Sequence, residues 1–300
     1  MQKMRQTGKK RWEAMDVISL ILMTLITLCI FIPFYNSIVI SFSTSGSYLR
    51  NPFAFWPSEG TLANYTKVLK NGTIFSCYLN TILITVVGTV LSMSTSVAAA
   101  FAFSRKAFPG KRFVFMLMLF TMFFSGGTIP TYLTIKQLGL IDTRLCIILM
   151  CGVSTFNIIV LKNGFEQIPN ALEEAAKIDG ANDMQIFVRI MLPLLTAQIA
   201  TFTLFTAVGY WNEWFLCMLY VTEKKLYPLQ YLLMEMQKNS EFLARNSSMI
   251  GASGAEALKS LPSQTMRMAV VVFIVLPIAC AYPFFQRYVV AGLTIGSVKG

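Results

Sequence analysis

Long runs without charged side chains recur along this chain. A helix needs about 20 mostly apolar residues to cross the hydrocarbon core of a bilayer. Six runs reach or approach that length; the fourth is short but bounded by Arg144 and Lys162, and the fifth is interrupted only by Glu213. They cover residues 17–40, 78–103, 113–135, 145–161, 194–220 and 268–286. The pattern predicts an all-α integral membrane protein with six transmembrane helices.

The composition agrees with a chain whose solvent is mostly lipid. Hydrophobic residues make up 55% of it and charged residues only 13%, whereas soluble domains carry about 25% charged residues. The first apolar run follows a basic stretch and could be a signal peptide. It is longer than the usual apolar region of about 7–15 residues, and no clear small-residue cleavage site follows it. We therefore expect an uncleaved first helix.

The distribution of lysine and arginine favours an N-terminus on the cytoplasmic side. With that orientation the inner segments hold 14 basic residues in 71 positions, and the outer segments hold 11 in 93. This moderate bias has the sign that cytoplasmic loops of membrane proteins show. We expect residues 1–16 to be a cytoplasmic N-terminus, residues 165–193 an inner loop and residues 221–267 an outer loop.

The chain lacks the residues that several classes of function require. The net charge is +11, but the basic residues cluster at the ends of apolar runs, where membrane topology explains them better than nucleic-acid binding does. The chain contains no histidine, the commonest metal ligand and general base. Its six cysteines form no C-x-x-C pair, and no G-x-x-x-x-G-K-[ST] loop for ATP occurs. We expect no catalytic residue, no metal and no cofactor bound by this chain.

The second apolar run carries a stripe of small side chains at four-residue spacing. Its members are Gly88, Ser92, Ser96 and Ala100. Small residues at this spacing allow helix backbones to approach closely in a membrane. We expect this helix to lie inside the bundle.

A polar segment between the fourth and fifth apolar runs contains signals for two short helices. Asn170 can cap a helix, and Glu173 stands at the capping-box position three residues later. Gly180 can end that helix in a left-handed turn. Asn182 can cap a second helix, with Gln185 as its capping-box partner. These features predict a helix–turn–helix at the membrane surface, although an ordinary amphipathic surface loop would explain them about equally well.

The same segment resembles the EAA motif of ABC importer permeases, which reads E-A-A, three residues, G, nine residues and I-x-L-P. Every fixed position is present, in residues 174–176, at Gly180 and in residues 190–193. The resemblance implies a cytoplasmic coupling helix that docks into a cleft of the ATP-binding subunit, with Glu174 and both alanines facing that subunit. The residues that it assigns to coupling are Glu173, Glu174, Ala175, Ala176, Gly180, Ala181, Ile190, Leu192 and Pro193.

Two further stretches extend the resemblance over nearly the whole chain. Residues 210–220, YWNEWFLCMLY, resemble the W-N-E-F stretch of carbohydrate-type permeases, with Trp214 in place of the usual phenylalanine. Residues 284–300 resemble the C-terminal tail of the maltose-type permeases, particularly the six-helix partner of the pair. The implied fold is the type I ABC importer (MetI-like) permease fold. It would form a single transmembrane domain over residues 17–300, with its core at about residues 73–287.

The resemblance also implies the partners and the mechanism. They are a second homologous permease in a heterodimer, two ATP-binding subunits that use ATP and Mg, an extracytoplasmic sugar-binding protein and a carbohydrate substrate, in a bacterial cell membrane. This chain would then be a non-catalytic subunit that works by alternating access. An ion-coupled secondary transporter is the alternative, but such proteins more often carry intramembrane ionisable residues, and here only Glu213 qualifies. An intramembrane enzyme would need a recognisable catalytic set, which the sequence lacks.

Trp211, Asn212 and Glu213 are the candidates for the substrate pathway. A charge at the centre of a spanning helix costs roughly 2.5–3.5 kcal/mol, so it usually faces a cavity or a partner. Near the outer interface, however, Glu213 would simply be hydrated. The aromatic residues around it could stack on sugar rings or form an interfacial belt, and we favour the belt.

Overall fold

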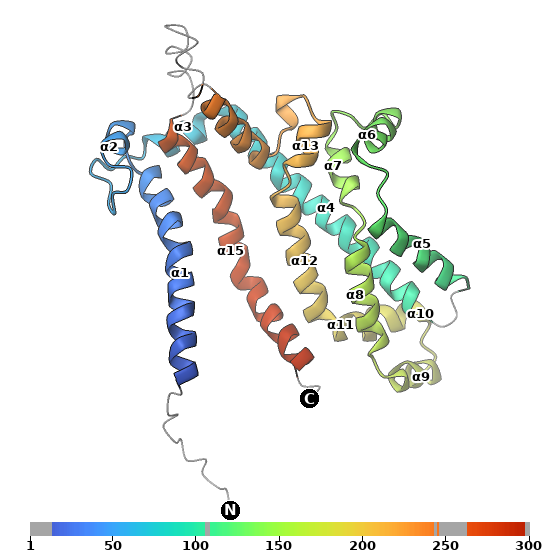
Figure 1. The fold of residues 1–300 in the computed structure, drawn as a ribbon. Coiled ribbons are helices and arrows are strands. Elements are labelled where there is room, and N and C mark those ends of the chain that lie inside the picture. Colours follow the sequence, from blue (N-terminus) through green and yellow to red (C-terminus); the bar gives the residue numbers. More distant parts are fainter. Residues whose placement is uncertain (1–13, 106–108, 243–244, 246–262, 298–300) are drawn as a thin grey trace, which may run out of the picture. The chain divides into compact units, whose positions relative to one another are not determined.

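The computed structural model describes residues 14–105, 109–242, 245 and 263–297. Throughout this part of the chain the regular structure is helical, and the one β-type contact is an isolated bridge between Ser43 and Gly60. The predicted all-α architecture is confirmed (Figure 1). Residues 229–242 also form a helix, which carries no label here. The labelled elements are α1 (Ala14–Ser41), α2 (Ser45–Arg50), α3 (Ala63–Lys70), α4 (Gly72–Ser104), α5 (Lys111–Phe123), α6 (Thr128–Gln137), α7 (Arg144–Met150), α8 (Thr155–Glu166), α9 (Asn170–Ile178), α10 (Asp183–Ile186), η1 (Phe187–Met191), α11 (Leu192–Leu194), α12 (Thr196–Trp211), α13 (Phe215–Tyr220), η2 (Lys224–Leu226) and α15 (Gln264–Ser297).

Three helices are long and apolar enough to cross a membrane by themselves: Met15–Ser41, Gly72–Ser104 and Gln264–Gln286. Three further spans arise only if each of three bent helix pairs counts as one. These pairs are α5 with α6, bent by 117°, α7 with α8, bent by 46°, and Asp183–Leu194 with α12, bent by 78°. The described residues therefore hold three to six candidate membrane spans.

The third, fourth and fifth apolar runs are each interrupted within their length. The third run breaks at Gly127, whose φ of +87° is incompatible with a right-handed helix. The fourth breaks at Ser154, whose side chain caps α8. The fifth breaks at residues 212–214, between α12 and α13. Hydropathy reports whether a run is apolar and is blind to such internal caps.

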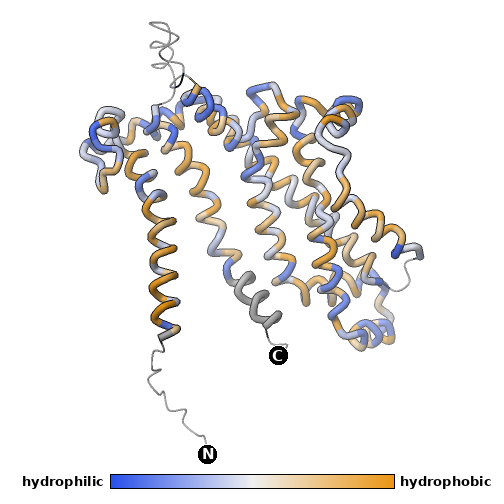
Figure 2. Tube along the Cα trace, viewed as in Figure 1, coloured by the Kyte–Doolittle hydropathy of each residue, from blue (hydrophilic) through white to orange (hydrophobic). Residues whose placement is uncertain are grey.

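The chain divides into two compact units: Met1–Lys67 with Pro262–Val272, and Val68–Leu261 with Phe273–Gly300. In the first unit, α1 is largely apolar, and Figure 2 shows it mostly orange. Most of its side chains are exposed, as suits a helix whose solvent is lipid.

The polar end of the first unit is organised around the buried side chain of Asn64. Its amide donates to the carbonyl oxygens of Ser41 and Ser43, at 2.9 Å each, and its oxygen accepts from the Thr265 hydroxyl at 3.2 Å. Because these groups come from three separate stretches, the satisfied network fixes how the chain leaves α1 and enters α15.

In the second unit, α4 packs against α8 and α12 (Figure 1). The small-residue stripe of α4 is buried, with Ser92, Ser96 and Ala100 fully covered. A Cβ built on Gly88 would lie 2.5 Å from the Tyr210 ring of α12, so only glycine fits there. The prediction that this helix lies inside the bundle is confirmed.

One core cluster joins the elements that carry the EAA segment to the spanning helices. Its buried members come from α4, α8, α9, α10, η1 and α12 and from Leu195, which precedes α12. They are Met93, Val97, Ala100, Phe103, Ile158, Leu161, Phe165, Ala176, Ile186, Met191, Leu195 and Phe202. The EAA segment therefore packs as part of the second unit.

A second polar node ties the turn before α7 to the chain after α13. The N–H of Asp142 donates to the carbonyl oxygen of Tyr220, and its carboxylate accepts from the backbone and hydroxyl of Thr222 and from the N–H of Glu223. These hydrogen bonds, those from Thr222 first, hold the pKa of the Asp142 carboxyl below its usual value. Residues 251–260, a glycine-containing stretch of the expected outer loop, lie outside the described residues.

Candidate functional site

Helix α9 carries the E-A-A residues, and it starts differently from the prediction. Pro169 occupies the N-cap position with an extended ψ of 129°, so Asn170 is already helical and no side chain caps this end. The predicted capping box between Asn170 and Glu173 is therefore wrong. Proline fixes φ near −65°, which lets the helix begin directly after it. Glu173 is left to find other partners.

The turn that ends α9 has the predicted left-handed glycine. Gly180 has a φ of +81°. The N–H of Gly180 donates to the carbonyl oxygen of Lys177 at 3.0 Å, and that of Ala181 to the carbonyl oxygen of Ala176 at 2.9 Å. This pair of bonds is the Schellman motif. It satisfies the last carbonyls of α9 and gives the turn one defined geometry.

The second short helix begins with the predicted capping box. The Asn182 side chain accepts from the Gln185 N–H, and the Gln185 side chain accepts from the Asn182 N–H, both at 2.9 Å. The chain then passes through the π-helix η1 before Pro193. Because proline has no N–H and its ring crowds the preceding turn, a widened turn is a suitable lead into it.

The two alanines of the motif face opposite ways. Ala176 is 8% exposed and packs in the core cluster, whereas Ala175 is exposed. Ala171, Glu174 and Ile178 are also exposed, Ile178 at 86%. Together with Ala175 these residues follow helical spacing along one side of α9, which we call the outward face. The resemblance implied that both alanines face a partner, but only Ala175 is available to one.

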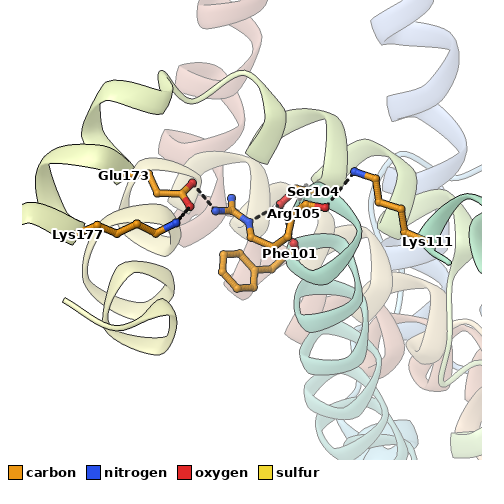
Figure 3. A network of polar contacts seen from close by, with 6 residues as sticks. All are labelled: Phe101, Ser104, Arg105, Lys111, Glu173 and Lys177. Atoms are coloured by element: carbon orange, nitrogen blue, oxygen red, sulfur yellow. Dashed lines mark hydrogen bonds and ion pairs between the residues drawn. The ribbon is translucent and has the colours of Figure 1, made fainter. Parts of the chain in front are cut away.

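Glu173 lies on the other side of α9 and meets Arg105, the residue that follows α4 (Figure 3). Its carboxylate accepts from the Arg105 guanidinium and, at 2.8 Å, from the Lys177 ammonium. The side chains of Arg105 and Glu173 are 20% and 19% exposed. Lys111 donates to the Arg105 carbonyl oxygen at 3.0 Å. These residues tie α9 to the end of α4 and the start of α5.

The charges of this cluster reinforce one another. The hydrogen bond from Lys177, and then that from Arg105, hold the pKa of the Glu173 carboxyl below its usual value despite burial. The same bond raises the pKa of Lys177. Glu173 and Lys177 are therefore both charged at neutral pH. A cavity of about 590 Å³ opens beside them and is lined by acidic and basic side chains alike.

Arg105 had no predicted role beyond its contribution to the basic bias of an inner segment. No local spacing connects Arg105 with a glutamate 68 positions later. The sequence indicated only that both residues lie in segments expected on the inner side of the membrane.

The three candidate pathway residues lie where α12 ends, and their surroundings differ. Trp211 is buried, and its indole N–H donates to the Ile274 carbonyl oxygen at 3.1 Å. Asn212 is exposed and accepts from Gln230 at 3.3 Å. The Glu213 carboxylate accepts from the Leu216 N–H at 2.8 Å and so caps α13. Among the residues that can be described, no group of three or more His, Cys, Asp or Glu side chains is placed to hold a metal.

Comparisons with known proteins agree on one family. The family model described as "binding-protein-dependent transport system inner membrane component" matches residues 112–295. The polygalacturonan/rhamnogalacturonan transport system permease protein YtcP of Bacillus subtilis is 39% identical over 269 residues, which cover 90% of this chain and 92% of that protein. Protein LplC of the same organism is 38% identical over 291 residues, 97% of each chain.

An archaeal relative and two solved structures extend the likeness. The trehalose/maltose transport permease MalG of Thermococcus litoralis is 30% identical, over 95% of this chain and 96% of that protein. A chain of a bacterial ABC transporter that imports the acidic polysaccharide alginate aligns with a TM-score of 0.81 and 30% identity, over 94% of this chain and all of that one. A chain of an alginate transporter in complex with a pentasaccharide-bound periplasmic protein has a TM-score of 0.56 at 14% identity, over 90% of this chain and 92% of that one, and shares the fold. The chain therefore belongs to the binding-protein-dependent transport system inner membrane components, as a permease subunit of a carbohydrate-type ABC importer.

Proposed function

We propose that this chain forms half of an oligosaccharide pathway, with a second homologous permease as the other half, and that ATP-binding subunits dock on the outward face of α9. The chain is a non-catalytic membrane subunit, because its family supplies the permease of the importer. ATP and Mg are used by the partner subunits. An extracytoplasmic sugar-binding protein delivers the substrate.

The outward face of α9 is the observation that supports docking most strongly. It combines an exposed acid, Glu174, a small side chain, Ala175, and an almost fully exposed apolar one, Ile178. Small residues allow close approach of a partner, and exposed apolar side chains gain when they are covered. The inner side of the helix is held by Ala176 and Glu173. Helix α9 is therefore anchored on one side and uncovered on the other, so a bound ATP-binding subunit that moves would move α9 with it.

Matched substitutions of exposed aliphatic residues test the docking. Ile178→Asp should release the ATP-binding subunits from the purified complex, because it puts a charge where an apolar side chain is covered. Leu138→Asp is the control, since Leu138 is also an exposed aliphatic residue but lies at the end of α6, far along the chain from α9. Equal retention of the ATP-binding subunits by both variants would contradict the docking.

The proposed orientation places both termini and residues 165–190 in the cytoplasm and residues 225–262 outside. The basic-residue bias supports it. Accessibility of introduced cysteines to an impermeant reagent in intact cells tests it. Labelling of residues 165–190 from outside would contradict both the orientation and the docking.

Acidic oligosaccharides are the substrates that we propose to test first. Two of the more similar proteins are named for polygalacturonan and rhamnogalacturonan or for alginate, which are chains built largely from uronic acids. Binding-protein-dependent uptake of trigalacturonate should exceed that of maltotriose, a neutral sugar of the same length. The opposite preference would refute the acidic class and leave the importer assignment intact.

Asn212 and Glu213 are the residues that we propose for the border of the pathway. They lie at the break between α12 and α13, where the regular helix is interrupted. Trp211 is buried against Ile274, so we assign it to positioning this break.

A further inference from the structure

We propose that Arg105 is a positioning residue for energy coupling, because its ion pair with Glu173 passes a movement of α9 directly to α4. The inference rests on the proposed docking of ATP-binding subunits on α9. It assigns adjacent glutamates of the motif to different tasks: Glu174 to the docking face and Glu173 to the internal link.

The covalent route from α9 into the membrane is indirect. From Gly180 the chain passes through α10, the π-helix η1 and α11, and then bends by 78° at Leu195 before α12. A turn, a widened helix and a sharp bend lie in series along this route. If a movement of α9 were transmitted only along this route, part of it would be lost in changes of the turn, the π-helix and the bend. A direct link to the long helix α4 avoids that loss.

Arg105 is held in the orientation that such a link requires. Its guanidinium lies over the Phe101 ring, 4.5 Å from the centroid. Its Nε donates to the Ser104 hydroxyl at 3.3 Å, and its carbonyl oxygen accepts from Lys111. Figure 3 shows the guanidinium directed away from α4 toward the Glu173 carboxylate. A planar, stacked guanidinium loses little freedom when it forms such a pair.

Phe101 extends the link beyond α4. Its ring packs against Phe187 of η1, with centroids 4.5 Å apart, and meets Phe165 of α8 edge-on at 5.8 Å. The Arg105 side chain therefore rests on an aromatic cluster that joins three elements of the bundle. A movement of the Arg105 guanidinium with Glu173 would therefore displace this aromatic cluster as well as the end of α4.

The two carboxylate oxygens of Glu173 have separate partners. One oxygen accepts from Lys177, within α9, and the other from Arg105, in the segment after α4. Lys177 thus fixes the carboxylate on its own helix and leaves the second oxygen to face Arg105. This arrangement distinguishes a link between elements from a simple surface ion pair.

Hydrogen–deuterium exchange of the assembled importer, with its partner permease and ATP-binding subunits, tests the inference. The ATP-dependent change in exchange is measured in two peptides, one covering α9 and one covering the last turns of α4, residues 97–104. In the unsubstituted complex we expect a change in both. In Glu173→Gln we expect the change in α9 to persist and the change in α4 to fall about fivefold, a coupling effect of ordinary size.

Four variants complete the design. Arg105→Gln and the double variant with Glu173→Gln should each match Glu173→Gln alone, because either change breaks the same link. Glu166→Gln removes the same kind of charge from α8, where Glu166 pairs with Lys162 of its own helix, and should leave the change in α4 intact. Arg105→Lys, which keeps the charge but not the stacked planar group, provides a milder test if a glutamine variant fails to assemble, and it should reduce the change in α4 by a smaller factor.

The outcomes separate this inference from the docking proposal. An unchanged α4 response in Glu173→Gln or in Arg105→Lys, with α9 still responding, would overturn the role of Arg105 alone. The role of Arg105 would also be overturned if the double variant lost as much of the α4 response as the product of the two single losses. Absence of any ATP-dependent change in α9 of the unsubstituted complex would overturn the docking and the inference together.

Discussion

Replacing Gly180 with valine should uncouple the importer without disturbing its membrane helices. Gly180 has a φ of +81°, and a Cβ built on it meets no atom within 4 Å. The cost of a side chain there is therefore backbone strain and not a clash. A left-handed conformation costs a residue with a Cβ roughly 1–2 kcal/mol, and a β-branched one is a more pronounced outlier. Strain of that size would shift the turn from its native geometry by a factor of about 5–30.

The assay is ATP hydrolysis by the reconstituted importer with and without its binding protein, beside co-purification of the ATP-binding subunits. Gly180→Val should lower stimulated hydrolysis or release those subunits, with a normal yield of the permease pair. Gly180→Asn is the matched control, because asparagine visits the left-handed region more readily than other residues with a Cβ. Full stimulated activity and full subunit retention in Gly180→Val would refute this reasoning.

Three further outcomes follow from the geometry. Gly88→Ala should lower the yield of folded permease, measured by size-exclusion chromatography, because its Cβ would lie 2.5 Å from the Tyr210 ring; a normal yield would show that α4 and α12 can separate at little cost. Glu213→Ala should reduce sugar uptake more than complex yield, the loss of its cap on α13 costing only about 1 kcal/mol; normal uptake would instead favour a hydrated interfacial carboxylate. The pKa of the Glu173 carboxyl is lowered in the folded protein, so its pair with Arg105 is intact above the unfolded pKa and is lost only as the pH falls through the lower folded value. The ratio of stimulated ATPase activity between the unsubstituted importer and Glu173→Gln should therefore stay constant from pH 8 to about pH 5.5. A ratio that approached one by pH 6 would contradict this.

The parts of the EAA segment that depend on neighbours in sequence were predictable. The left-handed Gly180 and the capping box of Asn182 with Gln185 each rest on residues within a few positions of one another. The small stripe of α4 was predictable for a related reason, since helical periodicity alone decides which residues share a face. The motif resemblance then gave these features a function that local physics could not.

The remaining features depend on contacts between distant residues or on backbone breaks inside apolar runs. Glu173 forms a long-range ion pair with Arg105 and does not form the local capping box that was predicted for it. Gly127 and Ser154 interrupt runs whose composition is continuous. The inward turn of Ala176 follows from how α9 is anchored and not from the motif. Hydropathy and local spacing identify neither a contact between distant residues nor a break inside an apolar run.

Cysteine cross-linking across the outward face of α9 tests most directly whether ATP-binding subunits dock there. Cysteines are introduced singly at Ala175, Ala176 and Ile178 in a chain whose six native cysteines are replaced. The assembled importer is treated with a short cross-linker that joins a thiol to a nearby amine. Cross-links to the ATP-binding subunits should form from positions 175 and 178, which are exposed, and not from position 176, which is buried in the core cluster. An intact complex with no cross-link from 175 or 178, or with equal cross-linking from 176, would contradict the docking of these subunits on α9.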